Sequence, residues 1–324
     1  MKKFLLLAFG FVSLVSSAQI SPKFYGEVKE LKELQSRTLI VEILEEDPKI
    51  LKKLDKPKKQ DDLIDYKLFI KQFNEEFKIY AAKYWKLNTK IEFKTTTEVL
   101  ALNKAKDKSY AILRFYNLKD NNSKGIDTRL SVSAIVYTRN ESSINQPDSK
   151  IYLPIRPDSK DKFLLEADYK YVLETLQANI KWIVSNDKVL SFDKYADKMS
   201  DENCSKLKGK TLLVGNDMMM KNRTQAEAIT NYNGDLKFVS ETELNNAFVN
   251  KIKNTAVLYS IPYGILKVGS GIQIANIVFF KVIVDCETGE ILWLHMPGGM
   301  SYGSNISYYL TEKEFKMMAN CKKP

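Results

Sequence analysis

The sequence resembles itself, and this internal repetition constrains the fold more than any other feature. Residues 91–99 (IEFKTTTEV) align with residues 236–244 (LKFVSETEL), and residues 34–41 (LQSRTLIV) align with residues 207–214 (LKGKTLLV). An ordered series of matches indicates two copies of one structural unit rather than chance similarity. We therefore expect two tandem repeated domains. They span residues 19–185 and 210–324, with a polar connection at residues 186–209.

Each copy opens with a short strand and continues with a helix. The strands, at residues 38–43 and 211–215, are apolar and β-branched without a helical period. In the first copy, aromatic residues recur at steps of three and four from about residue 65, which predicts a helix with one apolar face. The counterpart in the second copy, at residues 224–232, is shorter.

The first copy contains an insertion before its helix. Residues 45–48 and 56–62 are charged and contain prolines, which predicts an exposed loop. Beyond the helix, both copies show the order strand, helix and three strands, and close with a helix. Crossovers require parallel pairing, and the hairpins that follow add antiparallel strands. The predicted fold is therefore α/β, with a mixed sheet flanked by helices in each domain (β-α-β-α-β-β-β-α).

Two local motifs support this order. Thr95 with Glu98, and Ser240 with Glu243, fit the S/T-x-x-E capping box, in which each side chain binds the other residue's backbone amide. These glutamates are therefore expected to have a structural role. The segment DCETGE at residues 285–290 predicts a hairpin turn, with Gly289 available for positive φ.

The N-terminus predicts export. Lys2 and Lys3 precede an apolar run at residues 4–15 and small residues that end at Ala18, the layout of a secretory signal peptide (residues 1–18). Cleavage before Gln19 leaves 306 of the 324 residues and lowers the formal charge from +10 to +8. The remaining sequence contains no other run of 18 apolar residues, so no transmembrane segment is expected in the mature chain. We expect a periplasmic or extracellular protein.

The charge pattern indicates which classes of partner are expected, and the cysteines indicate which disulfides are possible. Basic and acidic residues alternate along the chain, which indicates a solvated surface, and export argues against nucleic acid. An envelope protein or an anionic glycan is the expected kind of partner. Cys204, Cys286 and Cys321 permit one disulfide in an oxidising compartment, and spacing leaves all three pairs open.

One motif suggests catalysis. Residues 299–303 (GMSYG) match the G-x-S-x-G pattern of hydrolases, and the only histidine, His295, lies six residues before Ser301. A nucleophile elbow requires a helix directly after the serine and a histidine later in the chain. The glycine- and serine-rich residues after Ser301 do not favour a helix, and no histidine follows. We therefore interpret the segment as a glycine-containing loop. With one histidine and three scattered cysteines, neither a metal site nor a cofactor is expected.

The strongest binding candidate follows the first strand of the second copy, because ligands gather at the carboxyl ends of parallel strands. Consecutive methionines offer an adaptable contact surface there. The candidate binding residues are Asn216, Asp217, Met218, Met219, Met220 and Arg223.

Residues 211–294 resemble a known family pattern. A first strand, the strand and capped helix LKFVSETEL, and a long strand ending in VDCETGEIL are similar to the N-terminal domain of the Tol-system translocation protein and to the curli-secretion lipoprotein family. The resemblance implies an envelope assembly or binding domain rather than an enzyme. We therefore expect a non-enzymatic binding or assembly module of the cell envelope. The alternatives are a small-molecule or glycan binder that uses the interdomain cleft and a carboxylate-based hydrolase.

Overall fold

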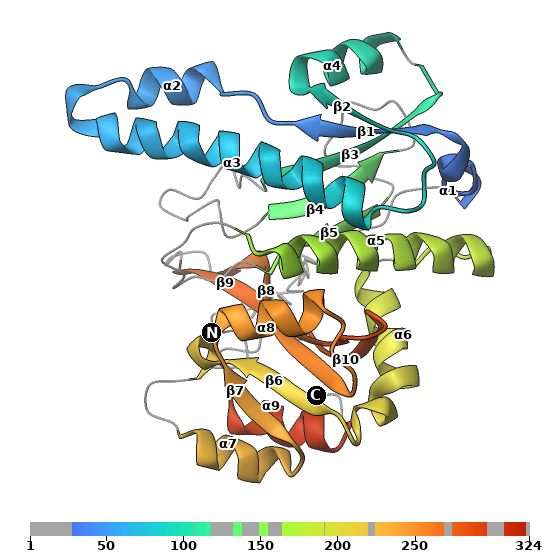
Figure 1. Ribbon diagram of the computed structural model, residues 1–324, viewed down its shortest axis with the longest axis vertical. Coiled ribbons are helices and arrows are strands. Elements are labelled where there is room, and N and C mark those ends of the chain that lie inside the picture. Colours follow the sequence, from blue (N-terminus) through green and yellow to red (C-terminus); the bar gives the residue numbers. More distant parts are fainter. Residues whose placement is uncertain are drawn as a thin grey trace, which may run out of the picture.

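The computed structural model describes residues 28–105, 107–117, 132–137, 149–154, 164–190, 192–219, 224–268, 274–296 and 308–321. The predicted signal peptide lies outside these residues. The described part of the chain contains two five-stranded mixed sheets flanked by helices, which confirms the predicted α/β class (Figure 1).

The first sheet has the strand order β2-β1-β3-β4-β5. Its central strand β1 pairs in parallel with β2 and β3, and β4 and β5 then add antiparallel pairs. The strands are β1 (Thr38–Ile43), β2 (Ile91–Thr95), β3 (Tyr110–Asn117), β4 (Val132–Tyr137) and β5 (Ser149–Tyr152).

The second sheet has the order β7-β6-β8-β9-β10 and the same pairing directions. Both units therefore show the predicted order of elements, although duplication of the chain itself stays a prediction. The strands are β6 (Thr211–Gly215), β7 (Leu236–Val239), β8 (Thr255–Val268), β9 (Ile274–Asp285) and β10 (Ile291–His295).

Helices cover both faces of the first sheet. Successive side chains of a strand point to opposite faces, and the central strand has apolar side chains on both faces. In β1, Leu39 and Val41 belong to the cluster that contains α3 (Gln60–Tyr84) and α5 (Glu166–Asn186). Ile40 points to the other face, where it packs with α4 (Thr96–Ala105).

The second sheet is covered in the same way. Leu212 and Val214 of β6 pack with α7 (Gln225–Tyr232) and α9 (Glu312–Ala319) on its outer face. Leu213 points inward, into the cluster that holds α8 (Glu241–Val249) and α5. The two units meet mainly through α5 and α8, with a smaller contact between β5 and β8.

Helix α5 is the centre of this junction. It lies between the two sheets in Figure 1, and it contacts both α3 and α8. One continuous apolar cluster includes Phe77 of the first unit, Leu173 of α5, and Phe248 and Val257 of the second unit. A shared core, rather than a flexible linker, holds the units together.

The segment predicted as an exposed loop in the first unit is exposed, but most of it is helical. Residues 45–48 and 56–62 flank or enter helices: α2 (Pro48–Leu54), a 3-10 turn (Pro57–Lys59) and the start of α3. Asp47 caps α2 by accepting from the Lys49 amide at 2.8 Å, and Pro48 occupies the first turn, where its missing N–H costs nothing. The proline therefore starts a helix instead of interrupting one. Figure 1 shows α2 and the first half of α3 extending beyond the sheet.

The segment between the units also contains a helix that the sequence did not predict. Helix α6 (Phe192–Asn203) and a 3-10 turn (Cys204–Leu207) lie within residues 186–209. Helix α6 packs on the edge strand β10: Ser200 Oγ accepts from the Leu294 amide at 3.0 Å, and Asn203 Nδ2 donates to the Ile291 carbonyl at 3.1 Å.

A disulfide joins Cys204 to Cys321, with the two Cα atoms 5.7 Å apart. It connects the 3-10 turn before β6 to the residues that follow α9, and so links the two ends of the second unit. Cys286 is a buried free thiol. The structure thus selects one of the three pairs that the sequence left open.

The predicted local motifs are confirmed. The Thr95 amide donates to Glu98 at 2.7 Å, and the Ser240 amide donates to Glu243 at 2.8 Å. Gly289 has a φ of 74° in the hairpin turn, a backbone conformation that favours glycine.

Candidate functional site

The described residues of the predicted binding loop, 216–219, mostly contact other parts of the second unit. Asn216 is exposed and accepts from Gln225 Nε2 at 3.2 Å, and Asp217 accepts a hydrogen bond from the Tyr308 hydroxyl. Met218 is buried in the core of the second unit, and Met219 is half-buried and forms a parallel bridge with Leu310. Met218 therefore stabilises the fold. Met220 and Arg223 lie outside the described residues.

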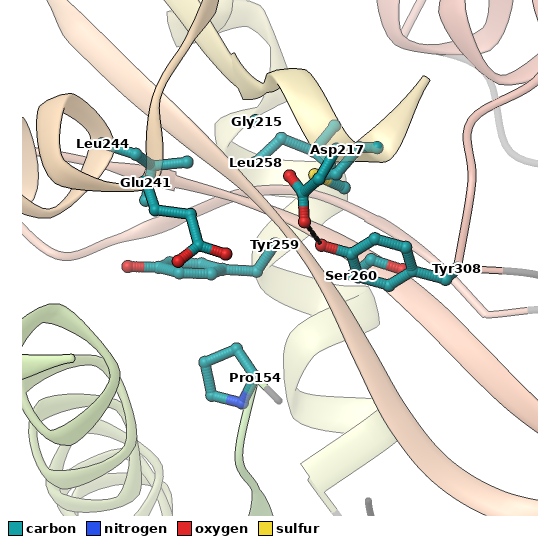
Figure 2. Close-up of a pocket in the computed structure, with 10 residues that line it drawn as sticks. Pro154, Gly215, Asp217, Glu241, Leu244, Leu258, Tyr259, Ser260 and Tyr308 are labelled. Carbon is teal, nitrogen blue, oxygen red and sulfur yellow. Dashed lines mark hydrogen bonds between the residues drawn. The ribbon is translucent and has the colours of Figure 1, made fainter. Parts of the chain in front are cut away.

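The space beside this loop is too small for an organic ligand. Figure 2 shows Asp217, Glu241, Ser260 and Tyr308 around it, with Pro154 contributed by the first unit. Its volume of about 10 Å³ holds about one water molecule. A Cβ atom on Gly215 would lie 2.5 Å from Asp217 Oδ1, so a larger residue there would move the Asp217 carboxylate.

A larger groove lies at the junction of the two units. It has a volume of about 440 Å³ and is open to solvent on one side. Glu174, Ala178 and Lys181 of α5 line one wall, and Thr288 and Gly289 of the β9–β10 turn line the opposite wall. Further lining residues come from the end of α3, from α6 and from the segment after α8: Lys86, Tyr195, Met199 and Lys251.

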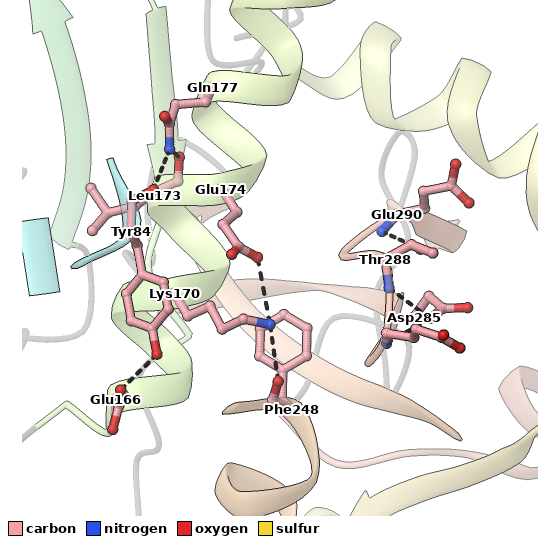
Figure 3. A network of polar contacts seen from close by, with 11 residues as sticks. Tyr84, Glu166, Lys170, Leu173, Glu174, Gln177, Phe248, Asp285, Thr288 and Glu290 are labelled. Carbon is pink, nitrogen blue, oxygen red and sulfur yellow. Dashed lines mark hydrogen bonds and ion pairs between the residues drawn. The ribbon is translucent and has the colours of Figure 1, made fainter. Parts of the chain in front are cut away.

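Buried polar contacts hold the α5 wall in place (Figure 3). The Lys170 side chain is 1% exposed; Nζ donates to the Phe248 carbonyl at 2.9 Å and lies 3.5 Å from Glu174. Burial lowers the pKa of Lys170, and Glu174 opposes this shift. Because Lys170 belongs to α5 and Phe248 to α8, the contact ties the first unit to the second beneath the groove.

Gln177 fixes the segment that carries Lys86. Its Oε1 accepts from the backbone amides of Lys86 at 2.6 Å and Leu87 at 3.1 Å, and its Nε2 donates to the Tyr84 carbonyl at 2.9 Å. All of these atoms are part-buried or buried, so the bonds are protected from water. The end of α3 is therefore held against α5 in one position.

The opposite wall is a rigid turn. Asp285 is buried, pairs with Lys210 at 2.7 Å and accepts from the amides of Glu287 and Thr288. Burial by itself would raise the pKa of Asp285, but the hydrogen bonds from Lys210, Thr288 and Glu287 together hold that pKa below its usual value. The predicted DCETGE turn therefore presents Gly289 toward α5, and a Cβ atom on this glycine would lie 3.3 Å from Glu174 Oε2.

His295 shows no catalytic arrangement among the described residues. Its ring is 2% exposed and stacks on Trp293, with the centroids 6.0 Å apart. Burial, followed by the charges of Lys281 and Lys313, lowers the pKa of His295 to about 4. Neither ring nitrogen has a hydrogen-bond partner within the described part of the chain. Ser301 and residues 299–303 lie outside the described residues.

Within the residues that the structure describes, no cluster of three or more histidine, cysteine or acidic side chains is arranged to bind a metal ion. No helix in the same residues combines the length and the apolar character needed to cross a membrane.

Comparison with protein-family models, curated proteins and solved structures gives no significant match. The resemblance of residues 211–294 to the Tol-system and curli-secretion families therefore stays a prediction. The interdomain cleft was expected only as an alternative binding site, and the sequence identified none of the residues that line the junction groove. These residues come from separate elements and share no motif, so no sequence signal was available to find them.

Proposed function

We propose that this protein is an exported binding protein that holds a small ligand in the junction groove. The observation that carries this proposal is the open cavity of about 440 Å³ between two units that share a core. Ligand sites in proteins typically have about 300–1,000 Å³ and are common at interfaces between domains. The groove meets both criteria.

The disulfide supports the export part of the proposal. Disulfides persist in oxidising compartments such as the periplasm and the extracellular space. The Cys204–Cys321 bond is compatible with the secretory signal predicted at residues 1–18.

The carboxylates in the groove suit binding better than glycoside hydrolysis. Glu174 and Glu290 both line it, but Glu174 lies 3.5 Å from Lys170 and Glu290 lies 2.8 Å from Lys206. A glycosidase needs one carboxyl group that is protonated before it acts as the general acid. An ion pair with a lysine favours the ionised form of a carboxyl group, so neither Glu174 nor Glu290 suits the role of a protonated general acid.

The proposal is tested by recovering the ligand. The purified protein is incubated with a small-molecule extract of the native host, washed and denatured, and the released compounds are identified by mass spectrometry. Ala178→Trp and Thr288→Trp fill the groove from opposite walls and should both abolish recovery. Saturating ligand should raise the free energy of unfolding by about 2.7 kcal/mol at a hundredfold excess over Kd. Equal recovery from wild type and both variants would refute the proposal.

A second candidate function, assembly with an envelope protein, is favoured by the helical arm formed by residues 48–72. All residues of the arm are described, and none is fully buried. Ile64 and Leu68 lie one turn apart on α3 and are 62% and 51% exposed, as expected for a contact surface. In a cross-linking pull-down from the envelope fraction, Ile64→Ser/Leu68→Ser should lose a specific partner. Ile79→Ser, which is 61% exposed outside the arm, should retain it.

A further inference from the structure

The rim of the junction groove carries three lysines from three different elements. Lys86 follows α3, Lys181 belongs to α5, and Lys251 follows α8. All three side chains are exposed, and Lys86 Nζ donates to the Ala82 carbonyl at 3.2 Å. None of them forms an ion pair with a carboxylate in the described residues. Three lysines that have no ion-pair partner in these residues therefore line one cavity.

The acidic residues in the same groove are already neutralised. Glu174 pairs with Lys170, which lies beneath the wall, and Glu290 pairs with Lys206 outside the groove. Because these carboxylates have other partners, they do not cancel the charge of the rim. Lys251 contributes to lowering the pKa of Lys170, after the larger effect of burial, so its charge acts on the buried lysine behind the α5 wall.

The rest of the groove is largely uncharged. Ala178 of α5 and Met199 of α6 are half-buried, and Tyr195 is buried beside them. These side chains suit the carbon skeleton of a ligand. The three rim lysines and the apolar side chains of Ala178 and Met199 therefore offer contacts for both the anionic groups and the carbon skeleton of a small organic acid.

We propose that the groove binds a small organic acid, with its carboxylate or phosphate groups between Lys86, Lys181 and Lys251 and its carbon skeleton against Ala178 and Met199. This inference rests on the proposed function, because it specifies the ligand of the same groove. Flexible lysines attract oxyanions of several geometries, so the site selects for charge more strongly than for a particular head group.

Three probes of matched length and different charge test the inference: succinate, butane-1,4-diol and 1,4-diaminobutane. Binding is measured by isothermal titration calorimetry on the protein purified from the periplasm after expression of the full chain. Succinate should bind, and the diol and the diamine should bind at least about tenfold more weakly. The affinity for succinate should fall as ionic strength rises, because the rim is exposed to solvent.

Two sets of variants locate the effect. Lys86→Gln/Lys181→Gln/Lys251→Gln should weaken succinate binding by about tenfold or more, a loss typical of several exposed ion pairs together. A control with the same change of net charge neutralises three exposed lysines outside the groove and should change the affinity less than about twofold. The control substitutions are Lys188→Gln, Lys208→Gln and Lys237→Gln.

The groove-filling variants separate failure of the inference from failure of the proposed function. If the diol or the diamine binds as well as succinate, and Ala178→Trp removes that binding, the groove is a ligand site but the organic-acid inference is overturned. If Ala178→Trp and Thr288→Trp leave the binding of every probe unchanged, both are overturned. Equal weakening by the rim variant and its control would show a general effect of net charge and would also overturn the inference.

Discussion

Removing the Cys204–Cys321 disulfide should strongly destabilise the second unit. The bond closes a loop with a sequence separation of 117 residues, which includes every strand of the second sheet. In the chain-entropy model, a cross-link over a loop of this length restricts the unfolded chain enough to stabilise the fold by about 5 kcal/mol. Whole domains are stabilised by about 5–15 kcal/mol, so the loss is a large fraction of the total.

The assay is urea unfolding of Cys204→Ala/Cys321→Ala, followed by tryptophan fluorescence. The double variant should unfold at a clearly lower urea concentration than the oxidised wild type. A reductant should lower the wild-type midpoint toward that of the variant and should leave the variant unchanged. Cys286→Ala keeps the disulfide, so it should keep the response to reductant.

Two results would contradict this reasoning. The first is a double variant whose free energy of unfolding lies within about 1 kcal/mol of the oxidised wild type, well below the expected loss. The second is a reductant that destabilises the double variant as much as the wild type, which would show that the effect does not come from this bond.

Three further predictions concern single side chains. Phe77→Ala should cost about 3–5 kcal/mol in urea unfolding because the ring is fully buried, whereas Ile79→Ala on the exposed face should change stability by less than about 0.5 kcal/mol. His295 has a pKa of about 4 in the fold against 6.5 when unfolded, so the unfolded state binds more protons between these values. As pH falls from about 6.5 to 4, wild type should lose up to about 3 kcal/mol relative to His295→Phe, and parallel pH–stability curves would contradict this. Gly215→Ala should cost about 1–2 kcal/mol in thermal unfolding, because the new Cβ displaces the Asp217 carboxylate from its hydrogen bond, and an unchanged midpoint would refute the reasoning.

Much of the local structure follows from the sequence. The apolar, β-branched composition of residues 38–43 and 211–215 predicts the two central strands, and the structure places β1 and β6 at these residues. The capping pair Ser240 and Glu243 predicts the start of α8. These predictions succeed because strand and cap formation depend on residues a few positions apart.

The errors occurred where tertiary contacts or the context of a proline decided the outcome. Pro48 suggested a loop, but with Asp47 as the cap it begins α2. Residues 192–203 were interpreted as a polar connection, yet they form α6. Tyr195, Ala196 and Met199 lie on one face of this helix and pack in the core, and hydrogen bonds to β10 add to its stability. Met218 was expected at a binding surface, and packing buried it instead.

By itself, the sequence determined the class of fold, the order of elements and the capping and turn motifs, because each depends on local patterns of side chains. Only the tertiary structure decided the disulfide pair, the sharing of α5 between the units and the position of the groove. The groove brings Lys86, Lys181 and Lys251 together from three separate elements. Such proximity arises from packing around a common core, and no local pattern of residues encodes it.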